Sequence, residues 1–261
     1  KPLDPGHTWY RYHGLFRDLL LHQLQIQEVV AGPLHRRAAA WLESHGHLGE
    51  AVEHALAAGD GETAGALIDR QLAGMLKHGE IATLIAWFRR LPDEFIRSSP
   101  DLSIDYSWPL IFAGEYAVAE DYLARADALA APDSPLSVHI LTVRAYLARC
   151  RGDVRRTIEY SELALQRLPE TLTEVRPILA VNLGMAYWHS GQMAAAEKAL
   201  NQALREAQRV SIHLPAGGAM DARLFAEDVG KALEGARHLD LDPGIVGTGD
   251  TVLPAHVVPA M

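Results

Sequence analysis

Apolar and small side chains recur along the chain in blocks of 33 to 39 residues, and each block is centred on a glycine. The glycines are Gly46, Gly79, Gly114, Gly152 and Gly191. The apolar or small residues stand four and seven positions before each glycine, a spacing that places them on one face of a helix. Glycine adopts the left-handed backbone that ends a helix, so a second helix can begin directly after it. The pattern predicts repeated helix-turn-helix units.

The positions around these glycines indicate how the units pack. Seven residues before each glycine stands a mostly small residue: Ala39, Leu72, Ser107, Ala145 and Gly184. Two residues after each glycine stands an apolar one: Leu48, Ile81, Tyr116, Val154 and Met193. Small residues allow a partner helix to approach closely, and Leu72 makes the second unit the least regular. A single helix pair cannot bury its own apolar face, whereas stacked pairs form a continuous core.

The last unit has the sharpest pattern. Its residues match the spacing of tetratricopeptide repeats: Leu183, Gly184, Tyr187, Gly191, Ala196, Leu200 and Ala203. Alternating strand patterns are weak everywhere except in the short run from Trp9 to His13. We therefore expect an all-α fold, a tetratricopeptide-like helical-repeat superhelix of about five to six antiparallel helix pairs.

The stretch WYRYHGLFRDLLLHQL, residues 9–24, looks at first like a chemical site because it concentrates aromatic, arginine and histidine side chains. Its apolar residues, however, fall at helical spacing: Leu15, Phe16, Leu19, Leu20 and Leu24. We expect one amphipathic helix here, with Arg11, His13 and Arg17 as contacts at a domain seam rather than catalysts.

Composition narrows the classes of function. The chain has 24 Lys and Arg against 33 Asp and Glu, a net charge of −9, which opposes binding of DNA or an anionic membrane by this segment alone. The single cysteine, Cys150, cannot form an internal disulfide, which favours a reducing, cytoplasmic location. There is no signal-peptide-like start or long apolar run. The chain also begins without Met, and we expect it to be a piece of a longer protein.

Three segments carry a family resemblance: WYRYHGLFRDLL, HRRAAAWLESHGHLGEAVEHALAAGD and WFRRLPDEFIRSSPDL, which begin at Trp9, His35 and Trp87. They resemble the middle of the large ATP-dependent LuxR-type transcriptional activators, the MalT-like regulators of the signal-transducing NTPase class. The resemblance implies an NTPase domain and a winged helix before a helical-repeat sensor, and a DNA-binding helix-turn-helix after it. It implies that residues 1–30 end the winged-helix domain and that residues 31–210 form the sensor. Beyond residue 210 the repeat pattern fades, and we expect residues 211–261 to form an irregular tail that could include one more helix pair.

The chain lacks the motifs that such a parent needs for its chemistry. No G-x-x-x-x-G-K-[ST] nucleotide loop occurs, and no convincing helix-turn-helix lies near the end. His45, His47 and His54 could suggest a metal site, but they flank a turn and have no Cys or HExxH partner. We expect no metal, no cofactor and no catalytic residues in this chain. An ATPase switch in the parent would lie elsewhere.

The first helix of each unit is expected to line an inner groove, with exposed positions every three or four residues. The predicted ligand-binding residues are Asp105, Trp108, Phe112, Thr142, Tyr146, Arg149, Asn182, Met185, Trp188 and His189. Aromatic faces with a few convergent polar groups suit a small molecule such as a sugar-like or aromatic effector. The alternative is that these rings only pack between helices. The charged segment Arg89 to Arg97 is a solvated face or a docking surface for another domain.

These patterns predict a noncatalytic sensor domain of a transcriptional activator. It would bind a small effector or a regulatory protein in the groove and so control the parent, with contacts to other parent domains and possible self-association. DNA would be reached only through a domain outside this chain, and no membrane is involved. The alternative is a general tetratricopeptide-like scaffold that binds proteins or peptides without sensing a small molecule.

Overall fold

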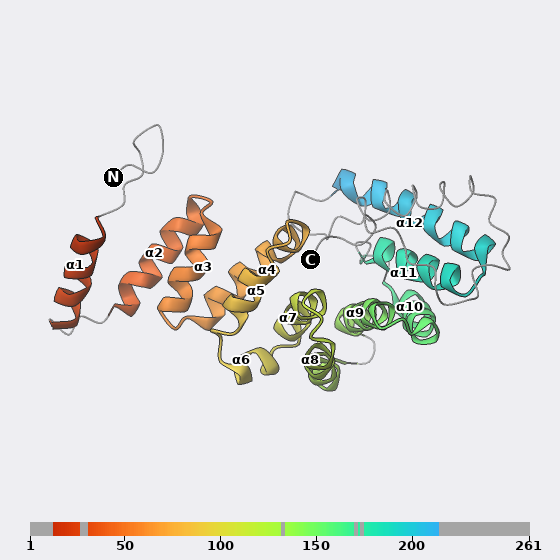
Figure 1. The fold of residues 1–261 in the computed structure, drawn as a ribbon, viewed down its shortest axis with the longest axis horizontal. Coiled ribbons are helices and arrows are strands. Elements are labelled where there is room, and N and C mark those ends of the chain that lie inside the picture. The colour runs from red at the N-terminus through yellow and green to blue at the C-terminus, as the bar shows by residue number, and fades with distance from the viewer. Residues whose placement is uncertain (1–12, 27–30, 132–133, 170–171, 173–174, 214–261) are drawn as a thin grey trace. The chain divides into compact units, whose positions relative to one another are not determined.

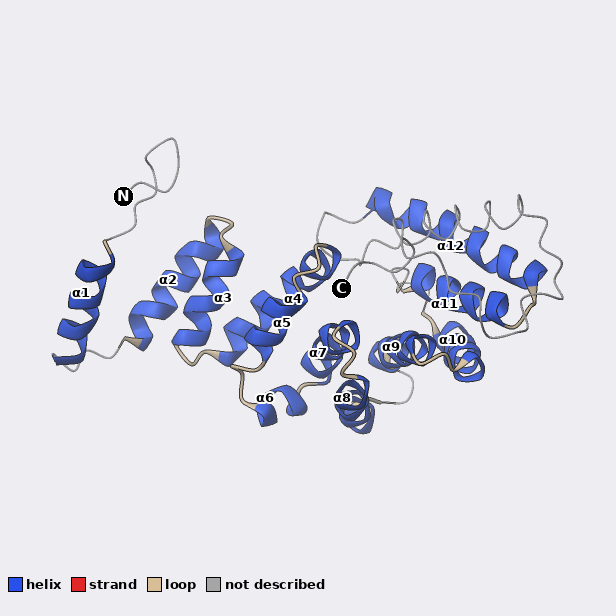
Figure 2. Ribbon diagram, in the orientation of Figure 1, coloured by secondary structure: helices blue, strands red, loops and turns tan. Residues whose placement is uncertain are grey.

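A computed structural model describes residues 13–26, 31–131, 134–169, 172 and 175–213 (Figure 1). Every regular element in these ranges is a helix, and no strand occurs in them (Figure 2). The all-α helical-repeat fold predicted from the sequence is therefore confirmed. The chain forms two compact units, residues 1–67 and 68–261, and the boundary between them falls within one helix, α4.

The helices follow one another with short connections. They are α1 (Gly14–Ile26), α2 (Gly32–Ser44), α3 (Leu48–Ala57), α4 (Gly61–Lys77), α5 (Ile81–Phe88), α6 (Asp93–Ser98), α7 (Pro100–Phe112), α8 (Tyr116–Leu129), α9 (Pro135–Cys150), α10 (Val154–Arg167), α11 (Arg176–His189) and α12 (Met193–His213). Within the second unit, α7 packs with α8, α9 with α10, and α11 with α12, so the chain folds back on itself pair by pair.

The recurring glycines end helices through one repeated backbone motif. At Gly46 the backbone is left-handed, with φ of 79°. The Gly46 N–H donates to the carbonyl of Glu43, and the next N–H, of His47, donates to Leu42. This pair of bonds is the Schellman motif, which satisfies carbonyls that the helix leaves free. The same two bonds recur at the other four glycines, and the next helix begins two residues after each, as the sequence predicted. Gly59 makes the same turn, which the repeat pattern in the sequence did not predict.

The small-residue positions lie where neighbouring helices meet. All five residues that stand seven positions before a repeat glycine are buried: Ala39, Leu72, Ser107, Ala145 and Gly184. Ser107 shows why a small side chain is needed there. Its hydroxyl donates to the Ser103 carbonyl of α7 at 2.7 Å and lies 3.3 Å from the Ala119 carbonyl of α8, so a larger residue would push the two helices apart.

The first unit is held by α2 packing on α3, with Ala39, Val52 and Ala55 almost fully buried. Helix α1 has the predicted amphipathic sequence, yet four of its apolar residues are exposed: Leu15 at 76%, Phe16 at 47%, Leu19 at 53% and Leu20 at 38%. The predicted amphipathic helix is present, and its assignment to a domain seam stays a prediction.

Some expectations differ from the structure or lie beyond it. The short helix α6 was not predicted. It begins after Pro92 and forms part of the irregular connection between the second and third helix-turn-helix repeats. Of the strand-like run from Trp9 to His13, only His13 is among the described residues, and the tail after residue 213 lies outside them.

Candidate functional site

Four of the ten predicted ligand residues form one cluster across α7 and α9. The Trp108 ring meets Tyr146 edge-on, with centroids 5.2 Å apart, and Phe112 lies 5.8 Å from Tyr146. The guanidinium of Arg149 stacks over the Tyr146 ring, 4.5 Å from its centroid. These residues are one turn apart on each helix, which is why both stripes reach the same place. We call Trp108, Phe112, Tyr146 and Arg149 the aromatic cluster.

Burial and charge set the chemistry of the aromatic cluster. Tyr146 is 8% exposed, whereas Trp108, Phe112 and Arg149 are half-buried. Burial raises the pKa of Tyr146 to about 12, against the opposing effect of the Arg149 charge. The Tyr146 hydroxyl is thus a neutral hydrogen-bond group at physiological pH. The cluster offers ring faces and one cation, a combination that can hold a flat or apolar molecule with a polar substituent.

Asp105 stands one turn before Trp108 on α7. Burial raises the pKa of its carboxyl well above the usual range, and the nearby charges of Asp69 and Asp101 raise it further. Burial, and then the charge of Asp101, also raises the pKa of Asp69. Asp69 lies on α4 and was not predicted, because nothing local in the sequence ties it to a residue 36 positions away.

Three predicted ligand residues are less accessible than expected. Thr142 and Asn182 are each 1% exposed, and Tyr146 is also buried, so the expectation of exposed groove positions is wrong for them. The Thr142 hydroxyl donates to the Val138 carbonyl one turn earlier. The side-chain amide of Asn182 has no hydrogen-bond partner among the described residues.

The third predicted stripe, on α11, stands apart from the aromatic cluster. Trp188 and Met185 are half-buried and His189 is exposed. The Trp188 and His189 rings have centroids 6.3 Å apart, and the Nδ1 atom of His189 lies 2.7 Å from the Met185 carbonyl. In the described part of the chain, no ring contact joins Trp188 to the aromatic cluster. Ligand binding by any of the ten residues stays a prediction.

The three histidines near the first turn do not converge on one point. The His45 ring stacks on Trp41, with centroids 3.9 Å apart. His54 instead lies beside His35, whose Nδ1 atom is 2.8 Å from that of His54. Burial and the charge of His35 lower the pKa of His54. Within the described ranges, no group of three or more His, Cys, Asp or Glu side chains is placed to hold a metal ion.

No helix in the described part of the chain combines the length and apolarity needed to cross a bilayer.

Comparison with known proteins gives two kinds of relative. The serine/threonine-protein kinase PknK of Mycobacterium tuberculosis is 32% identical over 188 residues, which cover 69% of this chain and 17% of the kinase. The HTH-type transcriptional regulator MalT of Klebsiella pneumoniae is 30% identical over 170 residues, which cover 64% of this chain and 19% of the regulator. No protein-family model matches the chain. The chain shares a homologous segment with both proteins, and that segment spans less than a fifth of either relative.

Proposed function

We propose that this chain is the effector-sensing helical-repeat domain of a MalT-like transcriptional regulator. The observation that carries the proposal is the aromatic cluster, in which Trp108, Phe112 and Tyr146 come together with Arg149 from two neighbouring repeats. A ligand there would contact both α7 and α9. It could therefore bias how one repeat packs on the next.

The two relatives support a role that is separate from catalysis. One is named a kinase and the other an HTH-type regulator, so a segment that both share is not explained by either named activity. A regulatory input is a role that both proteins could use. In this proposal the nucleotide-binding and DNA-binding parts lie elsewhere in the parent, and this chain holds no cofactor and catalyses no reaction.

The proposed mechanism is a shift between two states of the parent protein. An effector, either a small molecule or a regulatory protein, binds the aromatic cluster more tightly in an active, self-associating state than in a resting state. Such a difference in affinity is the only way in which binding can drive the change. The other parent domains are the partners that detect it.

Isothermal titration of the chain against sugars, nucleotides and aromatic acids tests the proposal. A compound that binds should lose affinity at least about tenfold in Trp108→Ala and Arg149→Gln, since each removes a contact typical of buried ring or cation recognition. Trp41→Ala is the matched control, because Trp41 is 49% exposed, stacks on His45 and lies outside the aromatic cluster. Circular dichroism checks that each variant is folded. Unchanged affinity in both cluster variants would remove the proposed site.

The second candidate is a protein- or peptide-binding scaffold without small-molecule sensing. The burial of Thr142 and Asn182 favours it, because it removes two of the polar groups that would orient a small ligand. If no small molecule binds while a partner's helix or peptide protects α7 and α9 from hydrogen exchange, the scaffold is the better description.

A further inference from the structure

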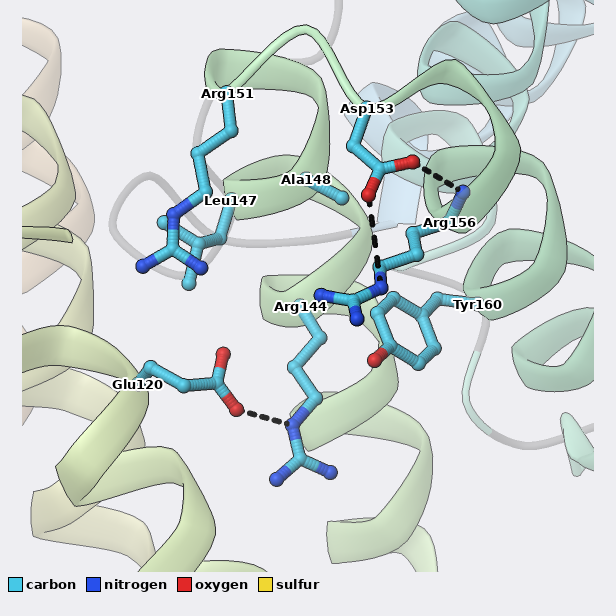
Figure 3. A pocket seen from close by; sticks show the side chains of 8 residues that line it. All are labelled: Glu120, Arg144, Leu147, Ala148, Arg151, Asp153, Arg156 and Tyr160. Atoms are coloured by element: carbon cyan, nitrogen blue, oxygen red, sulfur yellow. Dashed lines mark hydrogen bonds and ion pairs between the residues drawn. The ribbon is translucent and has the colours of Figure 1, made fainter. Parts of the chain in front are cut away.

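A small hollow lies among α8, α9 and α10, away from the aromatic cluster (Figure 3). Its lining residues come from three successive helices and one turn: Glu120, Arg144, Leu147, Ala148, Arg151, Asp153, Arg156 and Tyr160. Arg144 and Ala148 of α9, and Arg151 directly after its end, each stand two positions after a residue of the predicted stripe. Two residues turn a helix by about 200°, so this hollow opens on the opposite face of α9. We call it the arginine hollow.

Three guanidinium groups face the arginine hollow, and they differ in how well they are neutralised. Arg144 is fully engaged: its Nε donates to Glu120 at 3.1 Å and its Nη1 to Asp127 at 2.7 Å. Among the described residues, Arg156 pairs with the Asp153 carboxylate, 3.5 Å from its Nε, and that carboxylate also accepts the backbone N–H of Arg156 to cap α10.

Arg151 has no carboxylate within ion-pair distance among the described residues. Its Nη2 donates to the backbone carbonyl of Tyr116 at 2.9 Å, and its guanidinium lies 5.9 Å from the centre of the Tyr116 ring. Both contacts hold the side chain in place, yet neither cancels its charge. An oriented guanidinium without a counter-ion is prepared to bind an anion.

The sequence around Arg151 carries a local excess of positive charge, although the protein as a whole is acidic. The stretch RCRGDVRR, residues 149–156, has four arginines and one aspartate, while the whole chain has a net charge of −9. An acidic chain that concentrates arginine at one turn, and gives Arg151 no carboxylate partner in the part that the structure describes, presents a specific attraction for acidic groups.

The size and lining of the arginine hollow select the kind of anion. Its volume is about 150 Å³. This equals the volume that about five molecules occupy in liquid water, at about 30 Å³ each, and it is smaller than the sites that bind drug-sized ligands. Figure 3 places Arg151 and Arg156 on two sides of the hollow, with the Tyr160 hydroxyl and the Glu120 carboxylate facing the same space. The carboxylates of Glu120 and Asp153 oppose a dianion such as phosphate. A single carboxylate fits both the space and the remaining charge.

We propose that the arginine hollow binds an Asp or Glu side chain of an acidic segment in a partner protein, with Arg151 and Arg156 donating to the carboxylate. The hollow is too small to hold a free ligand tightly, so affinity comes from further acidic residues of that segment that lie beside Arg151 and Arg156. This surface is separate from the aromatic cluster and does not depend on the proposed effector site.

The test measures fluorescence anisotropy of a fluorescein-labelled hexaglutamate peptide titrated with the full chain at low ionic strength. We expect saturable binding, with hexaglutamine not binding. Arg151→Gln and Arg156→Gln should each weaken hexaglutamate binding about fivefold, the upper range for one exposed ion pair. Arg155→Gln is the matched control, since Arg155 adjoins Arg156 but pairs with Glu159 and does not line the hollow. It should change affinity less than twofold.

Each other outcome contradicts the proposal in its own way. No binding, or equal losses in all three variants, would mean that no specific carboxylate site exists. Competition by millimolar acetate with the same dependence on Arg151 would mean a site for small free carboxylates. Stronger binding of inorganic phosphate or a single-stranded oligonucleotide would mean a phosphate site. Helicity by circular dichroism, unchanged in all three variants, excludes loss of fold as the cause.

Discussion

The side chain of Leu200 on α12 occupies the space that a side chain on Gly184 of α11 would need. A Cβ atom built on Gly184 would overlap Cγ and Cδ2 of Leu200. Gly184 is buried and Leu200 is 4% exposed, so α11 and α12 approach closely at this point. The missing side chain is what allows the last helix pair to close.

Gly184→Ala should therefore destabilise the chain, although alanine is ordinarily the better helix former. We expect a loss of about 1–3 kcal/mol in the free energy of unfolding, typical of an overfilled core. Gly74→Ala in α4 is the control: nothing lies within 4 Å of an added Cβ there, and it should gain about 0.5–1 kcal/mol. Urea denaturation measures both. A urea midpoint for Gly184→Ala at or above that of the wild type would refute the steric explanation.

A second prediction concerns the ring stack between α5 and α7. Phe88 is fully buried and stacks on Tyr106, with centroids 4.6 Å apart and planes 17° from parallel. Phe88→Ala should cost about 3–5 kcal/mol because it leaves a cavity, and Phe88→Leu should cost about 1.5 kcal/mol or less. Phe16→Ala, at a ring that is 47% exposed, should stay within about 0.5 kcal/mol. Equal effects at Phe88 and Phe16, measured by thermal unfolding, would mean that the stack adds nothing.

A third prediction is a pH dependence at the junction of α6 and α8. The Tyr122 hydroxyl donates to Asp93 at 2.5 Å, and Arg97 donates to the same carboxylate at 2.6 Å. Both hydrogen bonds lower the pKa of Asp93, and the bond from Tyr122 has the larger effect. Stability from a carboxylate with a lowered pKa is present above its unfolded pKa, about 3.9, and is lost as the pH falls through the folded value.

Asp93→Asn should consequently be less stable than wild type at pH 6 by under about 1 kcal/mol, because Asp93 is exposed, and the difference should be smaller at pH 3, below the unfolded pKa of about 3.9. Urea titrations at both pH values measure it. Glu94→Gln, at the exposed neighbour, is the control and should leave stability unchanged at pH 6. A difference for Asp93→Asn that persists undiminished at low pH would show that the carboxylate charge is not the cause.

A fourth prediction concerns the thiol of Cys150. Burial raises its pKa, and the charge of Arg149 only partly offsets this effect. Because the thiolate is the reactive form, iodoacetamide should label the folded chain with an apparent pKa above that of the chain in urea. Arg149→Gln should raise the apparent pKa further. An apparent pKa equal to or below that of the unfolded chain would contradict the burial effect.

The candidate site could be predicted only in part. Trp108 and Tyr146 were placed on equivalent positions of successive repeats, and they do meet, although 38 residues separate them. Thr142 and Asn182 were placed by the same rule, yet they are covered. Asp69 and the arginine hollow were missed, although RCRGDVRR is a visible signal for the latter. A repeat register fixes the face of a helix but does not say how far the next helix covers that face.

The sequence by itself determined the helices, their pairing and the glycine turns, because helix periodicity and left-handed glycine act over a few residues and leave a direct record in residue order. The tertiary structure alone decided which faces are buried, which rings touch and which groups the Arg151 side chain contacts. Those outcomes depend on small differences in how neighbouring helices rotate and approach. At Gly184 the close approach of the two helices accommodates Leu200, and the Arg151 guanidinium donates to a backbone carbonyl of α8.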